Sequence, residues 1–244
     1  MQPVLRLRAG ADVLAVTDDA WTRELIPPTW SGPAWSLPGA AAYGSGPAGE
    51  PAATVTVVGA PAAAAALGAA VLADLPEAPY VLTVPRGAVP LPEGEAQEWE
   101  LMTTRTAPPP QPREEDVVPL APGPELADLL NAASPGHSVR PGAPEVHLWA
   151  GLRAGDGGLA SVGALLLREG TGAPHIASVA TAPAHRGQGL AAAVTAWLTR
   201  RALEGGAPWC SLAHLSTEQT AHRVYERLGY RTVQEFTSVT LDAW

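Results

Sequence analysis

Apolar and polar residues alternate along several short stretches of the chain, and elsewhere the apolar residues recur every three or four positions. A period of two is typical of strands with one buried face, whereas a period near 3.6 is typical of amphipathic helices. In the first part of the chain these periods predict strands at residues 4–8, 54–58, 80–84 and 98–103 and helices at residues 12–25 and 62–74.

The second part of the chain carries a longer series of the same elements. Strands are predicted at residues 114–120, 146–150, 159–167, 175–181, 209–215, 230–235 and 236–241. Helices are predicted at residues 124–133, from residue 190 to the Gly205-Gly206 stop, and from residue 216 or 217 onward. The middle helix has the clearest periodicity, with one apolar face formed by Leu190, Val194, Trp197 and Leu198.

A proline-rich stretch, Ala107-Pro-Pro-Pro-Gln-Pro112, separates the two parts. Such a stretch favours a stiff, extended conformation and is typical of connectors between domains. We therefore predict an N-terminal α/β segment at residues 1–106, a linker at 107–113 and a C-terminal domain at 114–244. The fold class is α/β (α+β), and one interpretation of the smaller N-terminal segment is a degenerate copy of the C-terminal fold.

The stretch from Ser178 to Ala191 contains the strongest candidate for ligand binding. It reads as the end of a strand, a proline-marked turn, a glycine-bearing loop and the first turn of a helix. Gly187 and Gly189 have no side chains to cover the main-chain amides where the helix begins. Free amides at the start of a helix form an anion site. A P-loop is excluded because the chain contains no lysine, and the dinucleotide fingerprint lacks its third glycine. We expect a diphosphate at this loop.

Two motifs then suggest a family. The spacing Arg186-x-x-Gly189-x-Ala191 resembles the Arg/Gln-x-x-Gly-x-Gly/Ala signature of the GNAT superfamily of N-acetyltransferases. The stretch Glu218–Tyr230 resembles the second motif of that family, a helix ending in Tyr-x-x-x-Gly-Phe/Tyr, with Tyr225 as its tyrosine. The resemblance is clear over about residues 174–230 and plausible over 114–244. It implies a GNAT-type mixed, mostly antiparallel central sheet flanked by helices.

The resemblance also implies acetyl-CoA as cosubstrate, bound largely by main-chain groups. The diphosphate would be held by the loop and the first helical turn, that is by Arg186, Gly187, Gln188, Gly189, Leu190 and Ala191. The pantetheine arm would pair with the strand residues Ser178, Val179, Ala180 and Thr181. An amide in the region of Val179 and Ala180 would stabilise the oxyanion of the transition state. Glu218 stands where the family often has asparagine, and it either contacts CoA or favours the helix start.

Tyr225 is the candidate general acid, because a phenol can donate a proton to a departing thiolate. By spacing alone it could instead be a core residue, since Ala221, Val224 and Leu228 share its helical face. The resemblance favours the acid.

The general base is left open by the sequence. The strand before the loop carries no carboxylate, so His175 and His214 are the nearest candidates, although strand histidines are often structural. His214 is favoured because its strand should diverge from the neighbouring strand beside the thioester. A partly neutral amine that loses its proton to water would need no base. His137, His185 and His222 are interpreted as loop or solvated helix positions. No metal is expected, because no cluster has metal-ligand spacing.

The net charge and the cysteine content limit the classes of binding partner and the cellular compartment that we expect. The formal net charge of −9 disfavours nucleic acid and anionic membranes as partners. Cys210 is the only cysteine, which excludes an intrachain disulfide and favours a cytoplasmic protein. It lies in an apolar run, which indicates a buried, inert thiol. The N-terminus places arginines where a signal peptide needs apolar residues.

We therefore predict an acetyl-CoA-dependent N-acetyltransferase that acts on a primary amine by direct attack in a ternary complex. The acceptor would be a small-molecule or peptide amine, and the N-terminal segment would wall its pocket or support a homodimer. Two alternatives stay open. One is a non-catalytic acyl-CoA-binding or sensing module, suggested by Glu218 and the missing strand carboxylate. The other is an N-acyltransferase that uses longer acyl-CoA.

Overall fold

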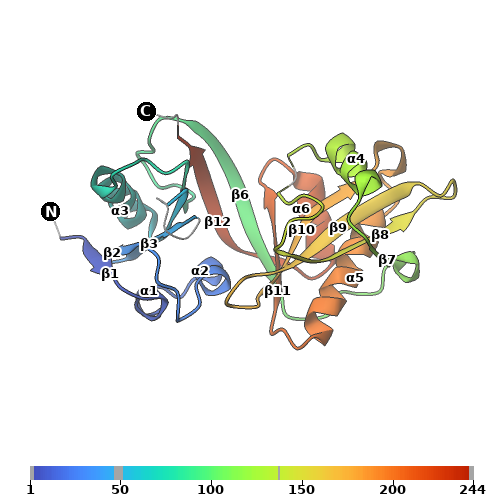
Figure 1. Cartoon of the computed structure of the whole chain (residues 1–244), viewed down its shortest axis with the longest axis horizontal. Helices are drawn as coiled ribbons and strands as arrows, with labels where there is room; N and C mark the ends of the chain where they lie inside the picture. The colour runs from blue at the N-terminus through green and yellow to red at the C-terminus, as the bar shows by residue number, and fades with distance from the viewer. Residues whose placement is uncertain (1–2, 47–51, 137, 242–244) are drawn as a thin grey trace. The chain divides into compact units, whose positions relative to one another are not determined.

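The computed structural model describes residues 3–46, 52–136 and 138–241 (Figure 1), and its contacts divide the chain into two units. Among the described residues, the first unit comprises those up to Leu101, Leu215–Thr217 and those from Val233 onward. The second unit comprises the remainder, so the boundary falls within three strands, β6, β11 and β12. His137, interpreted above as a loop residue, lies outside the described residues.

The first unit is a sheet covered on both faces. Its elements are β1 (Leu5–Leu7), α1 (Gly10–Val16), α2 (Ala20–Leu25), β2 (Ala34–Leu37), β3 (Ala40–Ser45), β4 (Thr54–Gly59), α3 (Pro61–Asp74), β5 (Val81–Pro85), most of β6 (Glu95–Thr104) and most of β12 (Arg231–Thr240). The strands from β1 to β5 pair in sequence order, and β12 pairs antiparallel with β5. The core on one face contains Leu67 and Val71 of α3, whereas the core on the other contains Val13 of α1.

The second unit has the same layered construction. Its elements are β7 (Val118–Leu120), α4 (Pro124–Ala133), β8 (Val146–Arg153), β9 (Leu159–Leu167), β10 (Pro174–Thr181), α5 (Leu190–Glu204), β11 (Cys210–Leu215) and α6 (Gln219–Arg227), with short 3₁₀ helices at Glu114–Asp116 and Pro183–His185. One face of its sheet packs against α5 and α6, and the other face packs against α4. Gly163 of β9 allows the close approach of α5, because a Cβ there would lie 3.1 Å from both Val194 and Leu198.

The first unit repeats the topology of the second. Both pair their strands in the order of the sequence, with three antiparallel pairs (β1–β2, β2–β3 and β3–β4; β7–β8, β8–β9 and β9–β10) followed by one parallel pair. In each unit a single helix, α3 or α5, connects the two parallel strands. This repeat supports the interpretation of the N-terminal segment as a degenerate copy of the C-terminal fold.

Some predicted elements differ from the structure. Residues 230–241 form one strand, β12, rather than two, because no turn residue interrupts them. Residues 114–120 form a 3₁₀ turn and a short strand, and residues 12–25 form two helices in place of one. The hairpin of β2 and β3 was not predicted, because its alanine-rich strands lack the β-branched residues that mark strands.

The two units also differ from the predicted domains. From Val233 onward β12 belongs to the first unit, where its partner is β5, although the sequence assigned it to the C-terminal domain. Its Gln234 side chain accepts a hydrogen bond from Trp21 N at 2.7 Å and donates to Asp19 Oδ1 at 2.8 Å, so it holds the start of α2. The proline-rich segment lies in the second unit, where Arg200 of α5 donates to Pro108 O at 2.7 Å.

No helix within the described ranges is both long enough and apolar enough to cross a bilayer. Cys210 is fully buried, as its apolar surroundings in the sequence predicted.

The buried hydroxyl of Tyr230 provides a test of the packing between α5 and the end of α6. Thr199 donates to Thr195 O at 2.7 Å, so the phenol must be the donor in its 2.7 Å hydrogen bond to Thr199 Oγ1. Tyr230→Phe should lower the free energy of unfolding by about 1–2 kcal/mol, because it removes a buried hydrogen bond. Tyr80→Phe, at a 69% exposed position, is the control and should change it by less than about 0.5 kcal/mol in the same denaturant titration. Equal effects of the two changes would contradict the assignment.

Candidate active site

The two parallel strands of the second unit separate soon after they begin. The ladder between β10 and β11 pairs only His175 with Ser211 and Ile176 with Leu212, although β10 continues to Thr181 and β11 to Leu215. The pairing of β10 with β11 therefore ends at Ile176. This is the divergence that the sequence analysis expected beside His214.

A bulge lies in β10 at the same level. The pairing with β9 shifts between Ala177 and Ala180, and Ser178 has a positive φ of 51°. The Ser178 hydroxyl fixes this conformation, since it accepts from Val139 N at 3.1 Å and donates to Val139 O at 3.2 Å. A bulge leaves the extra residue out of the ladder and redirects its main-chain groups. The predicted pantetheine strand is thus irregular on one edge and separated from its neighbour on the other.

The loop after β10 reaches the helix through two glycines. Pro183 begins a short turn, and Gly187 and Gly189 have φ of 76° and 77°, a region that favours glycine. A Cβ at either glycine would meet no atom within 4 Å, so the space in front of the loop is open. The first intrahelical bond of α5 is donated by Ala193 to Gly189 O, which leaves the preceding amides of the first turn available to a ligand. The exposed Gln188 lies between the glycines, whereas Leu190 is buried and Ala191 half-buried.

Arg186 contacts carbonyl groups on both sides of the loop. Its Nη2 donates to Ala133 O at the end of α4 at 3.0 Å, and its Nε donates to Thr181 O at 3.4 Å. These contacts tie the loop to α4 and to β10. The Thr181 hydroxyl in turn lies 2.9 Å from the Ser161 hydroxyl, which donates to Ala180 O at 3.0 Å. Several predicted cofactor residues thus also fix the shape of the loop and of the strand before it.

Tyr225 is buried on α6 and faces the core formed with α5, together with Ala221, Val224 and Leu228. Its hydroxyl makes no hydrogen bond to any residue in the described part of the chain. Burial raises the pKa of Tyr225 to about 12, and the charge of Glu218 adds to the shift. The phenol therefore keeps its proton at neutral pH. Its ring centroid lies 6.0 Å from that of His214, so the structure brings these two candidates together.

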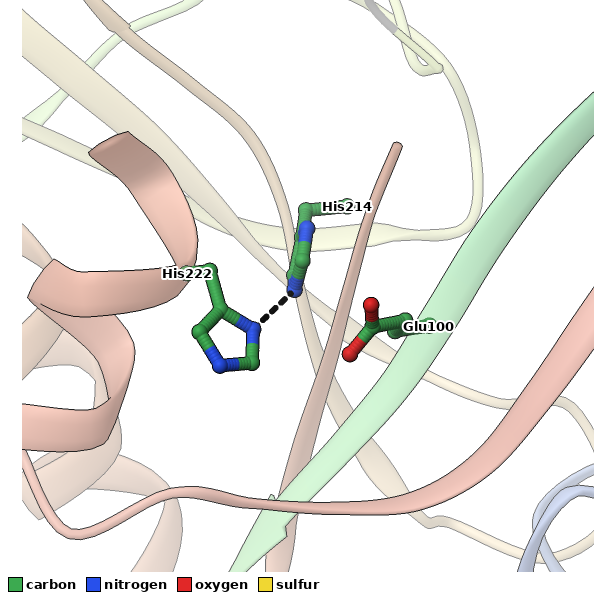
Figure 2. Close-up of side chains that lie close together, drawn as sticks. All are labelled: Glu100, His214 and His222. Carbon is green, nitrogen blue, oxygen red and sulfur yellow. Dashed lines mark hydrogen bonds between the residues drawn. The ribbon is translucent and has the colours of Figure 1, made fainter. Parts of the chain in front are cut away.

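His214 is joined to a second histidine that the sequence analysis treated as solvated (Figure 2). His214 on β11 is buried, and its Nε2 lies 3.2 Å from Nδ1 of His222 on α6. Glu100, also drawn in Figure 2, belongs to the first unit. Zinc–imidazole bonds measure about 2.0–2.1 Å, so two nitrogens at this separation could also be ligands of one metal ion. Sequence spacing did not reveal the pair, because a strand and a helix supply one histidine each.

His175 is not part of this group. Its Nδ1 lies 2.9 Å from the Ser211 hydroxyl, which donates to Pro174 O at 3.2 Å. Successive strand residues point to opposite faces, and Ile176 points into the core that contains Tyr225. The structure therefore places His175 on the opposite face of the sheet from Tyr225 and His214.

Glu218 is exposed at the start of α6 and accepts no capping hydrogen bond through its side chain. Its effect on the site is electrostatic, through the pKa of Tyr225.

The sequence contained one indication that His222 could belong to the site. His222 and Tyr225 are three residues apart on a helix, which places them on neighbouring positions of one face.

Comparisons with known proteins agree with this geometry. Residues 147–232 match the family model described as an acetyltransferase (GNAT) domain. The chain is similar in structure to a GCN5-related N-acetyltransferase from Sphaerobacter thermophilus, with 14% identity and a TM-score of 0.57 over 96% of this chain and 94% of that one. It is also similar to an acetyltransferase from the GNAT family from Colwellia psychrerythraea, with 12% identity and a TM-score of 0.54 over 99% and 100%. A comparison with curated proteins found no match.

At these identities the likeness to solved structures establishes the fold. The family match identifies a GNAT acetyltransferase domain at residues 147–232, as the two motifs predicted. The mixed, mostly antiparallel sheet flanked by helices is confirmed as well. The domain supports acyl transfer as the class of reaction.

The pKa of Tyr225 offers a direct test of the environment at this site. Removing a nearby negative charge makes a phenolate easier to form, so Glu218→Gln should move the pKa of Tyr225 down from about 12 while burial keeps it above 10. Glu204→Gln, at the far end of α5, should leave it unchanged. NMR of the protein labelled with ¹³C at the tyrosine ring carbon that bears the hydroxyl would follow both titrations. The same pKa in parent and Glu218→Gln would contradict the assigned cause.

Proposed function

We propose that the chain is an acetyl-CoA-dependent N-acetyltransferase that transfers an acetyl group to a primary amine by direct attack in a ternary complex. The observation that supports this most is the combination in one unit of a strand that leaves its neighbour and an open glycine loop at the start of α5. The strand offers main-chain groups to a pantetheine arm, and the loop offers amides to a diphosphate. The protein would act in the cytoplasm.

In the proposed binding mode CoA lies along β10 and ends at α5. Ser178, Val179, Ala180 and Thr181 would bond the amides of the pantetheine arm through their main-chain groups. The diphosphate would lie at Gly187, Gln188 and Gly189 and at the amides of Leu190 and Ala191. The Val179 and Ala180 region would supply the oxyanion donor, and such donors contribute roughly 10²–10³ in rate. Arg186 would hold the loop in shape.

The reaction then needs two proton transfers. The amine nitrogen attacks the thioester carbonyl carbon, a C–N bond forms, and the C–S bond breaks as the tetrahedral intermediate collapses. Tyr225 would donate its proton to the departing sulfur. Burial keeps the phenol protonated at neutral pH, so Tyr225 has a proton to donate. His214 would take the proton that the amine loses.

A non-catalytic acyl-CoA-binding module and an N-acyltransferase for longer acyl groups are the competing functions. Release of free CoA thiol on incubation with acetyl-CoA and an amine library distinguishes the enzyme from the binding module. Comparison of acetyl-CoA with longer acyl-CoA in the same assay decides the acyl chain length.

The glycine loop can be tested by binding alone. Gly189→Ala forces a side chain into a left-handed conformation, which costs roughly 1–2 kcal/mol and should reshape the loop. We expect the Kd for CoA, measured by calorimetry, to rise about 10-fold or more. Gly206→Ala is the matched control, because Gly206 has a φ of 89° and equally open surroundings just beyond the opposite end of α5. It should leave the Kd within about 2-fold, and a similar loss in both variants would argue against the loop as the CoA site.

The role of Tyr225 can be tested by kinetics. Tyr225→Phe keeps the apolar contacts of the ring and removes the proton donor, so kcat should fall roughly 10-fold or more with little change in acetyl-CoA affinity. Tyr80→Phe, which removes an exposed hydroxyl in the first unit, should leave kcat unchanged. Thiol release followed at saturating acetyl-CoA measures both. Equal kcat for Tyr225→Phe and the parent would remove the proposed acid.

A further inference from the structure

The hydrogen bond between His214 and His222 begins a chain of polar groups that leads outward from the proposed reaction centre. His214 is buried beside Tyr225, and its Nε2 lies 3.2 Å from Nδ1 of His222 (Figure 2). His222 lies on the first turn of α6, and its side chain is 22% exposed. One element thus supplies both Tyr225 and the partner of His214.

The second nitrogen of His222 faces a carboxylate. Nε2 of His222 lies 3.6 Å from Oε1 of Glu226, four residues further along α6, and the Glu226 side chain is 50% exposed. The exposure therefore rises in steps from His214 through His222 to Glu226. His222 has one nitrogen 3.2 Å from His214 and the other 3.6 Å from Glu226, which is the arrangement that passes a proton across a ring.

We propose that His222 is a positioning residue that, with Glu226, forms a proton relay from His214 to solvent. The inference rests on the proposed function, in which His214 takes the proton of the attacking amine. The amine proton goes to Nδ1 of His214 while the Nε2 proton of His214 moves to Nδ1 of His222. The Nε2 proton of His222 then moves to the Glu226 carboxylate, which releases it to water. No net charge is left on either imidazole.

The relay solves a problem that burial creates. His214 is buried, so a proton that it accepts from the amine needs a path to bulk water. Transfer along a hydrogen-bonded pair removes the charge in the same step in which it would form. After the transfer His214 carries its proton on Nδ1, and return of the protons along the same pair is needed before the next turnover.

The first test compares His222→Asn with the parent enzyme. The asparagine amide can occupy the place of Nδ1 and keep a hydrogen bond to His214, but it cannot pass a proton across itself. We expect kcat to fall about 10-fold or more, with the KM for acetyl-CoA within about 2-fold of that of the parent. His147→Asn, the same substitution at an exposed position of β8, is the control and should change neither constant. A chelator in all assays keeps metal ions off the histidine pair.

Two further readouts separate a relay from a merely structural role. In mixtures of light and heavy water, the rate of the parent should depend on the deuterium fraction along a curve, because two or more protons move together, whereas His222→Asn should give a straight line. For His222→Ala, added imidazole should restore kcat at least 5-fold in a saturable way. The weakly basic 1,2,4-triazole, of similar size, should not. Glu226→Gln should lower kcat only about 2–3-fold, since water can replace an exposed carboxylate.

The outcomes distinguish a failure of the proposed relay from a failure of the proposed acetyltransferase function. If the parent releases CoA thiol and His222→Asn does so at the same rate, the relay is wrong and the acetyltransferase stands. A slow His222→Ala that imidazole does not rescue, with identical isotope dependence in His222→Asn and parent, also overturns the relay and leaves His222 a structural role. If the parent binds CoA but releases no thiol with any amine, the proposed function fails and the relay fails with it.

Discussion

The separation of β10 from β11 is the constraint on which the rest of the second unit depends. Parallel strands normally satisfy each other's main-chain groups, so strands that part after two pairs must use those groups elsewhere. The bulge at Ser178 and its two hydrogen bonds to Val139 hold β10 in this arrangement. Beyond the last pair, His214 lies near the end of β11, with its ring centroid 6.0 Å from that of Tyr225. The proposed thioester site and its side chains thus follow from one irregularity in an otherwise regular sheet.

The first unit shows what the fold becomes without that irregularity. The pairing of β3 with β4 is continuous, with no bulge. Ala60 N bonds Gly39 O, as Ala182 N bonds Ala160 O in the second unit, but α3 begins at once with Pro61. No glycine loop follows, and a proline at the first helical position has no amide to offer a phosphate. The first unit therefore has the layers of the second unit without its glycine loop.

The site combines main-chain groups of the glycine loop with side chains of β11 and α6. The sequence predicted the loop, but it did not predict how the side chains meet. The loop at Gly187 and Gly189 was predictable because the residue types themselves determine local conformation. The fold class and the GNAT domain followed from two motifs. The pairing of His214 with His222 was not predicted, because it depends on how α6 packs against the end of β11. The structural position of His175 was equally hidden, since its hydrogen bond to Ser211 joins two distant strands.

By itself, the sequence determined the local elements: the periodicity of α5, the extent of α4, the glycine turn and the apolar face of α6 that contains Tyr225. These depend on interactions between residues close in the chain, which sequence spacing records directly. Only the tertiary structure decided that β12 pairs with β5, that the proline-rich segment packs against α5, and that two histidines meet beside the tyrosine. Such contacts join residues far apart in the chain, and their free energy depends on burial and register in the whole fold, which local pattern does not carry.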